Sequence, residues 1–269
     1  MRFLLSLALV CLALPLAAKD ADLKRLDTGD DSKGWEAVGR LDLGQKGFCT
    51  GALIAPDLVL TAAHCLFDPK TGERLDPGKM EFQAGFRNGR ALAYRAVRRA
   101  AVHPDYSYGG GVSAERVRND IALLELHLPV KNPQIRPFEI ADMPEAGARV
   151  GVVSYAEGRE EAPSLQDVCR VQERREGVLV MSCKINFGAS GAPVFGFDGG
   201  KARIVSVVSA KAMSNQRNVS LGTQLKAPLE VVRAELARGE AGFSSAAPGQ
   251  AQRIAGGARR DTGAKFVTP

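Results

Sequence analysis

Three short segments of this 269-residue chain carry side chains suited to nucleophilic catalysis. They are His64 in residues 60–65 (LTAAHC), Asp120 in residues 119–124 (NDIALL) and Ser190 in residues 188–193 (GASGAP). A serine hydroxyl is a weak nucleophile at neutral pH, and it becomes effective when an imidazole accepts its proton and a carboxylate orients that imidazole. We therefore predict that these three side chains meet as a catalytic triad.

The residues next to Ser190 predict a site that stabilises negative charge. Gly188 and Gly191 flank the serine without side chains, which allows a tight turn. The N–H groups of Gly188 and Ser190 could then point at one oxygen atom and form an oxyanion hole. Position 192 is Ala, so the Gly-x-Ser-x-Gly elbow of α/β-hydrolases is absent, and the chain order of the three groups also differs from theirs.

Each motif alone has an ordinary structural explanation. A serine between glycines is usually a turn, a histidine beside a cysteine is usually a packed ring, and Asn-Asp is usually a loop or a cap. The three explanations do not account for three motifs in this order within one chain. His103 and His127 have no such context, and we interpret both as structural.

The elements that must position these groups read as strands. Aromatic residues make up 6% of the chain, while 29 Gly and 14 Pro interrupt many short apolar runs. Two strand clusters, at about residues 38–128 and 148–226, predict an all-β fold of two small barrels joined by a Pro-marked connection at residues 128–137. After Pro228 the apolar spacing predicts a short helix over residues 229–238, ended by Gly239.

The two ends of the chain predict export and a loose tail. Residues 1–18 have one Arg before an apolar run that is too short to span a bilayer, and we interpret them as a signal peptide of a secreted or periplasmic protein. Residues 19–34 read as an arm or pro-segment, with packed structure from about Trp35. One folded domain of residues 35–240 would follow, with barrels at about 35–128 and 148–228. Residues 241–269 are predicted to be disordered.

Charge does not indicate a nucleic-acid partner for the globular part of the chain. The net charge is +6, of which Arg2 in the predicted signal contributes +1 and residues 241–269 contribute +3, so only +2 remains for residues 19–240. A globular surface for nucleic acid is not indicated, because phosphate binding needs clustered cations. A separate interpretation has the tail bind anionic polymers or nucleic acid. We expect a monomer without a membrane span that uses no cofactor.

Four cysteines remain after the predicted signal: Cys49, Cys65, Cys169 and Cys183. In an oxidising compartment an even number indicates two disulfides, for which three pairings exist. We favour Cys49 with Cys65 and Cys169 with Cys183, because each pair brackets a hairpin-like stretch. Zinc is not indicated, since there is no Cys-x-x-Cys and His64 directly precedes Cys65.

The three motifs resemble the chymotrypsin-like serine peptidases, over Trp35 to about residue 229, and most closely the bacterial glutamyl-endopeptidase-like subgroup. The resemblance implies that residues 35–240 form a peptidase domain of two six-stranded antiparallel barrels with the active site between them. It implies an acyl-enzyme mechanism on protein or peptide substrates, with His64, Asp120 and Ser190. It also implies that residues 205–211 are an edge strand that pairs with substrate backbone.

The chain departs from the family at the activation switch and in the specificity pocket. Ala189 stands where trypsin-like zymogens have an Asp that receives a new N-terminal ammonium, so we expect other bonds, involving Asn186, to hold the oxyanion turn. Substrate-binding residues are predicted at four positions: Lys184, Ser209, Ala210 and Lys211. Lys184 replaces an acidic residue, which disfavours cleavage after Arg or Lys and leaves acidic, small and apolar preferences open. These departures also leave open a catalytically silent binding module.

Overall fold

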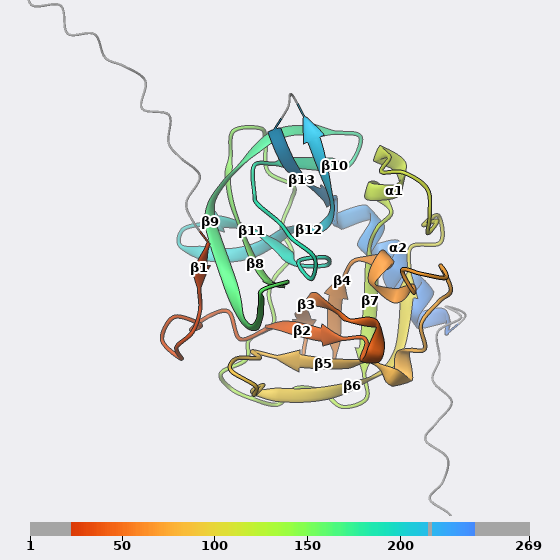
Figure 1. The fold of residues 1–269 in the computed structure, drawn as a ribbon, viewed down its shortest axis with the longest axis vertical. Coiled ribbons are helices and arrows are strands. Elements are labelled where there is room, and N and C mark those ends of the chain that lie inside the picture. Colours follow the sequence, from red (N-terminus) through yellow and green to blue (C-terminus); the bar gives the residue numbers. More distant parts are fainter. Residues whose placement is uncertain (1–22, 215–216, 240–269) are drawn as a thin grey trace, which may run out of the picture.

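The short apolar runs between Gly, Pro and Asp residues form the strands of two antiparallel barrels (Figure 1). The computed structural model describes residues 23–214 and 217–239. Both barrels have six strands and both are closed, which confirms the predicted all-β, two-barrel fold class. The catalytic candidates come from both barrels, so the way the barrels meet decides whether a site can form.

The N-terminal barrel is built in the order β2-β3-β4-β7-β6-β5. Its strands are β2 (Val38–Asp42), β3 (Phe48–Ala55), β4 (Leu58–Thr61), β5 (Glu81–Ala84), β6 (Ala93–Val102) and β7 (Ala122–Leu126). Short helical turns lie between them: η1 (Gly44–Lys46), η2 (Ala63–Leu66), η3 (Pro77–Lys79) and α1 (Ala114–Arg118). The ring of Phe82 fills the interior at Gly39, where an added Cβ would lie 2.4 Å from that ring.

The C-terminal barrel closes through pairing of its first two strands, β8 and β9. Its strands are β8 (Arg149–Ala156), β9 (Arg159–Arg175), β10 (Val178–Met181), β11 (Pro193–Asp198), β12 (Lys201–Ser214) and β13 (Arg217–Thr223). A seventh strand, β1 (Lys24–Arg25), adds to the outside of β9. The long strands β9 and β12 shift register against their neighbours at several points, and such bulges let the sheet bend and close.

Apolar packing joins the two barrels. Buried residues of the N-terminal barrel share one cluster with Tyr155 and Phe195 of the C-terminal barrel. The ring of Phe195 lies 4.9 Å from that of Trp35 and 4.7 Å from that of Phe138, centroid to centroid. Burial of such rings is a large favourable contribution to folding, so the barrels dock through a core and not through a flexible hinge.

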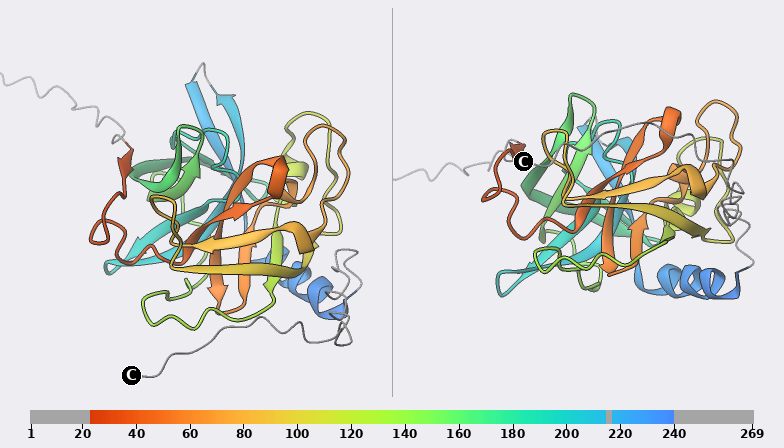
Figure 2. Two further views of the ribbon diagram at one scale, coloured as in Figure 1. Left: turned by 60° about the horizontal axis from the view of Figure 1, so that its bottom comes forward. Right: turned by 90° about the horizontal axis from the view of Figure 1, so that it is seen from below.

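The C-terminal helix α2 (Lys226–Arg238) packs against β6 and β7 of the N-terminal barrel. Figure 2 shows it along the outside of that barrel. It begins three residues before the predicted start, because Pro228 lies within its first turn, where a missing N–H costs nothing. Gly239, with φ of 68°, ends it. No helix among residues 23–214 and 217–239 is long and apolar enough to cross a membrane.

Packed structure begins earlier than the expected Trp35. Lys24 and Arg25 pair with β9, and Leu26 is fully buried. The short, charged arm gave no periodic signal, because its order comes from pairing with a strand far away in sequence. The predicted signal peptide (1–18) and basic tail (241–269) lie outside the described residues.

Both favoured disulfides are present. Cys49 in β3 is bonded to Cys65 in η2, and Cys169 in β9 is bonded to Cys183, just after β10. Each therefore closes a short stretch between neighbouring elements, as the bracketed hairpins indicated.

Candidate active site

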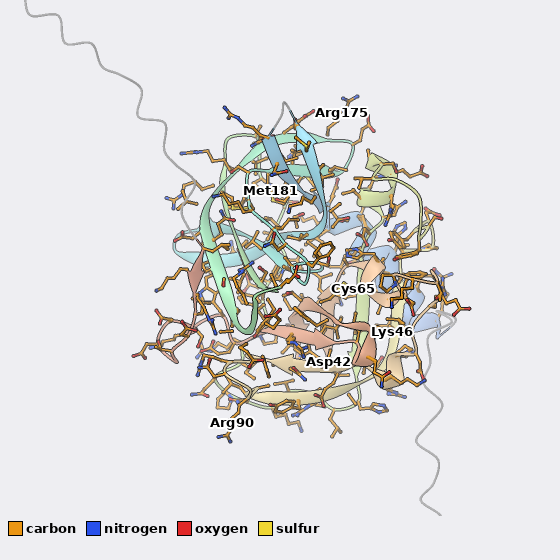
Figure 3. All side chains as sticks on the ribbon, viewed as in Figure 1. Asp42, Lys46, Cys65, Arg90, Arg175 and Met181 are labelled. Carbon is orange, nitrogen blue, oxygen red and sulfur yellow. A yellow bond between two sulfur atoms is a disulfide. The ribbon has the colours of Figure 1, made fainter. Side chains whose placement is uncertain are left out.

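The first candidate, His64, lies on a short turn that a buried strand and a disulfide hold in place. All four residues of β4 are buried, and η2 follows it directly. The disulfide of Cys65 ties this turn to β3, and the Thr61 hydroxyl donates to Thr50 O (2.9 Å). Figure 3 labels Cys65, the residue after His64, in the zone between the barrels. The imidazole is thus fixed at the edge of the N-terminal barrel.

Asp120 holds this histidine through both of its carboxylate oxygens. Oδ1 accepts the His64 backbone N–H at 2.9 Å, and Oδ2 lies 2.7 Å from Nδ1 of the same ring. The Asp120 side chain is 3% exposed and that of His64 is 21% exposed. A proton on Nδ1 satisfies the buried carboxylate, which leaves Nε2 as the acceptor on the other side of the ring. This tautomer is the one that a general base requires.

A tyrosine adds to the electrostatics beside this pair. Tyr106 is buried, and its burial, together with the nearby charge of Asp120, raises the pKa of its phenol well above the usual value. The phenol therefore stays neutral and adds no second negative charge beside Asp120.

Ser209 brings the C-terminal barrel to the same carboxylate. The pairing of β12 with β13 shifts register between Val208 and Ala210, so Ser209 is the extra residue of a bulge. Bulges turn a side chain away from the regular alternation of a strand. Here the Ser209 hydroxyl donates to Asp120 Oδ2. Ser209 thus contacts Asp120, the acid of the predicted triad, directly.

Ser190 lies on the turn between β10 and β11, and this turn packs on the His64 segment. Its carbonyl accepts the Thr50 N–H at 2.9 Å, and the next N–H, of Gly191, donates to Val208 O at 2.9 Å. A Cβ added to Gly191 would lie 2.0 Å from Thr61 Oγ1 and 2.9 Å from Ala62 N. Only glycine allows this approach, which sets the serine turn against the residues that lead into His64.

The serine hydroxyl itself is not yet engaged. Among the described residues it has no hydrogen-bond partner, and the ring of His64 is not one either. Contacts of this kind are often long in a free enzyme and shorten when substrate is bound. The backbone therefore brings the two motifs together, while the hydroxyl–imidazole bond is not formed in this state.

The two predicted oxyanion donors have no acceptor among the described residues. The carbonyl of Phe187 accepts from Glu157 N at 2.7 Å, and that of Ala189 accepts from Ala192 N at 3.0 Å. In a trans peptide the N–H points opposite to the C=O. The N–H groups of Gly188 and Ser190 are therefore directed away from those contacts and stay available, and Gly188 has φ of 89°.

The predicted specificity residues lie on two segments, the one that leads to Ser190 and strand β12. Lys184 is exposed, and its backbone N–H donates to Gln166 Oε1 (2.8 Å). Lys211 Nζ, on β12, lies 3.5 Å from Asn186 Oδ1 of the other segment, and Ala210 lies between Ser209 and this lysine in the chain. Each segment also carries an exposed apolar side chain that the motifs did not indicate: Phe187 (84% exposed) and Met213 (71%).

One group of potential metal ligands occurs in the described part of the chain: Cys49, His64 and Cys65. Both sulfurs are in a disulfide, so no thiolate is available, and one imidazole alone does not make a zinc site.

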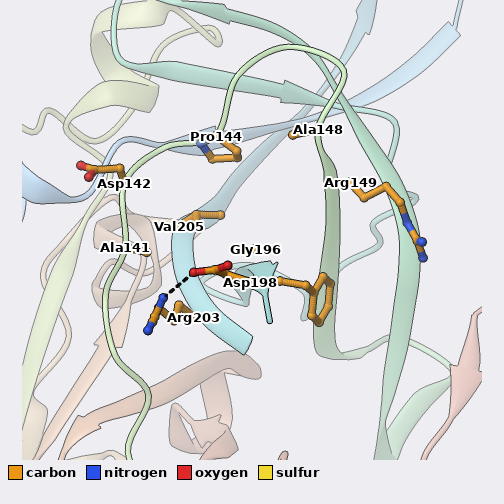
Figure 4. Close-up of a pocket in the computed structure, with 10 residues that line it drawn as sticks. Ala141, Asp142, Pro144, Ala148, Arg149, Gly196, Asp198, Arg203 and Val205 are labelled. Atoms are coloured by element: carbon orange, nitrogen blue, oxygen red, sulfur yellow. Dashed lines mark hydrogen bonds and ion pairs between the residues drawn. The ribbon is translucent and has the colours of Figure 1, made fainter. Parts of the chain in front are cut away.

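A cavity of about 570 Å³ opens elsewhere on the C-terminal barrel (Figure 4). Arg203 and Asp198 form an ion pair at 3.1 Å across it. Its lining includes none of the predicted site residues: Ala141, Asp142, Pro144, Ala148, Arg149, Gly196, Phe197, Asp198, Arg203 and Val205. The predicted catalytic residues therefore do not line this cavity.

Comparison with known proteins places the chain in a family. The model of the trypsin-like peptidase domain matches residues 49–203, more than half of the chain. The chain therefore belongs to the trypsin-like serine peptidases, which are hydrolases. Sequence relatives include a trypsin from Phaedon cochleariae, 35% identical over 105 residues (38% of this chain, 36% of that protein), and serine protease 23 from Bos taurus, 30% identical over 169 residues (55% and 43%).

The chain spans less than half the length of these relatives. A solved structure of Glu endopeptidase in complex with MPD matches the fold, with a TM-score of 0.65 and 17% identity, over 80% of this chain and 98% of that one. The likeness is consistent with the predicted subgroup and, at this identity, concerns the fold alone.

Sequence reasoning missed two contributors to the site. Thr50 binds the serine turn from the opposite barrel. Glu157, which follows β8 of the turn's own barrel, binds this turn with its backbone N–H. Neither lies in a catalytic motif. Only the position of Thr50, directly after a cysteine of the predicted disulfide, could have drawn attention to it.

Proposed function

We propose that this protein is a secreted or periplasmic serine endopeptidase that uses His64, Asp120 and Ser190 as its triad. The observation that carries the proposal is the packing of Gly191 on Thr61 and Ala62, which sets the serine turn beside the histidine turn. The paired oxygens of Asp120 on His64 support it. Export is supported by the predicted signal peptide and by two disulfides, which form in oxidising compartments.

The proposed reaction proceeds through an acyl-enzyme. His64 Nε2 takes the hydroxyl proton while Ser190 Oγ forms a bond to the carbonyl carbon, and the oxyanion is held by the N–H groups of Gly188 and Ser190. The C–N bond then breaks, and the leaving amine takes the proton from His64. Water attacks the ester in the same way, so that a carboxylic acid leaves and the serine is regenerated.

A peptide substrate would bind along β12. Up to Val207 this strand pairs with β11, while residues 210–214 pair on one side only among the described residues, with β13. An extended peptide can add to such an edge. The cationic Lys211 beside Asn186 would then face the side chain before the cleaved bond.

The test is a peptide-library digest with the mature protein, read by mass spectrometry. We expect internal cleavage by the wild type and none by Ser190→Ala. Lys211→Ala reports on specificity: it should change the residue preferred before the cleaved bond. A wild type that leaves the library intact would contradict the proposal and favour the catalytically silent binding module.

A further inference from the structure

Thr50 is a fully buried threonine of β3 that reaches across to the C-terminal barrel. Its hydroxyl lies 2.8 Å from Gly188 O and 3.3 Å from Tyr155 O, and it accepts the Tyr155 N–H at 3.1 Å. A hydroxyl has one proton, and the shorter distance identifies Gly188 O as its acceptor. One side chain of the histidine-bearing barrel thus links the end of β8 to the oxyanion turn.

These contacts determine the direction of the Gly188 N–H. The peptide before Gly188 is held at its carbonyl by Glu157 N, and the peptide after it is held at its carbonyl by the Thr50 hydroxyl. With both neighbouring planes fixed, φ and ψ of Gly188 are fixed as well. Glycine at φ of 89° would otherwise rotate easily, so the hydroxyl removes the freedom that would turn this N–H away from the oxyanion position.

No ion pair among the described residues holds the turn at this point. Ala189 is fully buried and offers only a methyl group, so it can form no ion pair. Asn186, which we expected to take part in holding the turn, contributes its backbone carbonyl, which accepts the Ala189 N–H at 3.0 Å, while its side-chain oxygen lies 3.5 Å from exposed Lys211. The buried side chain that links the turn to the other barrel is Thr50.

We propose that the Thr50 hydroxyl is the positioning group that keeps the oxyanion hole formed in this chain, in place of a charged anchor. The proposal rests on the proposed peptidase function. The oxyanion hole would then depend on the docking of the two barrels, because Thr50 belongs to the barrel that also carries His64.

The test compares Thr50→Val, which keeps the shape and loses the hydroxyl, with Thr50→Ser, which keeps the hydroxyl. Thr50→Val should lower kcat by about 10- to 100-fold, with KM changed less than about threefold, since a misdirected donor acts on the transition state. The inhibition constant of a peptidyl trifluoromethyl ketone, whose adduct carries an oxyanion, should weaken in parallel. Thr50→Ser should stay within about threefold of the wild type in each value.

Ser206→Ala is the matched control, because it removes another buried hydroxyl. The Ser206 hydroxyl donates to Thr223 O at 2.9 Å and makes no hydrogen bond to the oxyanion turn. This variant should have a lower thermal stability, while its affinity for the trifluoromethyl ketone relative to its affinity for substrate should stay as in the wild type. A folded Thr50→Val with wild-type kcat, or a kcat loss that Thr50→Ser does not restore, would overturn the proposal while the peptidase function stands. An inactive wild type would overturn both.

A measurement on the wild type decides the question if Thr50→Val does not fold. In a crystal structure of the trifluoromethyl ketone adduct, Thr50 Oγ1 should remain hydrogen-bonded to Gly188 O while Gly188 N binds the adduct oxygen. An adduct in which this bond is broken and the oxygen is still held by Gly188 N would overturn the proposal.

Discussion

The two barrels hold the proposed catalytic groups by different means. In the N-terminal barrel the contacts come from a side chain: Asp120 binds both the backbone and the ring of His64. In the C-terminal barrel, Ser190 is held through the backbone of its turn, and two of the bonds to this turn come from Thr50 on the other barrel. The pairing of Asp120 with His64 is made within one barrel, and Ser209 of the other barrel adds to the carboxylate, whereas the position of the serine turn depends on docking.

Substitutions should therefore act differently in the two halves. A change at His64 should remove a chemical group and leave the packing between the barrels intact. A change in the serine turn should disturb the packing between the barrels and affect stability as well as chemistry.

The largest effect is expected when one group is removed from each barrel. His64→Ala and Ser190→Ala should each lower kcat by on the order of 10⁶-fold, and the double variant should be no worse, because the two groups act as a unit. Steady-state assays at high enzyme concentration measure the loss. If the two losses multiplied in the double variant, the groups would be acting independently and the triad assignment would be wrong.

The turn itself is tested at Gly191. Gly191→Ala places a Cβ 2.0 Å from Thr61 Oγ1 and 2.4 Å from Thr50 O, at φ of 75°. We expect the free energy of unfolding to fall by about 3–4 kcal/mol from strain and overpacking, together with a loss of kcat. Gly199→Ala is the control, since it has φ of 55° and open space around the new Cβ. It should cost only about 1 kcal/mol. Equal losses in urea unfolding would contradict the close approach.

The two disulfides compare the barrels directly. Their cysteines are 16 and 14 residues apart, so each should contribute about 3 kcal/mol by restricting the unfolded chain. Only Cys49–Cys65 frames His64. Cys49→Ser/Cys65→Ser should therefore lose kcat in addition to stability, whereas Cys169→Ser/Cys183→Ser should lose mainly stability. Thermal unfolding and kcat measured on the same samples check this, and an equal kcat loss in both would refute it.

The smallest effect is a pH dependence within the N-terminal barrel. Burial lowers the pKa of His103, against the opposing charges of Asp105 and Glu235, and Nδ1 of this ring accepts the Asp105 N–H. The unfolded chain therefore binds a proton more readily. Stability from this group is complete above a pH of about 6.5 and is lost as the pH falls from there toward the lowered pKa. His103→Gln should flatten this slope in urea midpoints, and His127→Gln, at an exposed ring, should not.

Much of this architecture could be read from the sequence, and for local reasons. Gly, Pro and Asp separate the strands, and the catalytic candidates sit in short motifs around His64, Asp120 and Ser190. The cysteine pairs bracket neighbouring strands, so their bonding followed from proximity along the chain.

What could not be read is non-local. Thr50 lies in no motif. Its proposed role arises only when the two barrels dock, because its partner Gly188 is 138 residues away in the chain. The bulge that directs Ser209 toward Asp120 depends on how β12 pairs with β13. The early start of packing at Leu26 depends on β9, which lies far away in sequence.

Intact-mass analysis after treatment with a fluorophosphonate tests the meeting of the two barrels most directly. The reagent forms a bond only to a hydroxyl that an imidazole can deprotonate beside a hole for the new oxyanion. We expect a single adduct on the wild type, mapped to the peptide that contains Ser190, and none on Ser190→Ala or His64→Ala. An unlabelled, folded wild type, or an adduct that persists in His64→Ala at the wild-type rate, would refute the proposed triad.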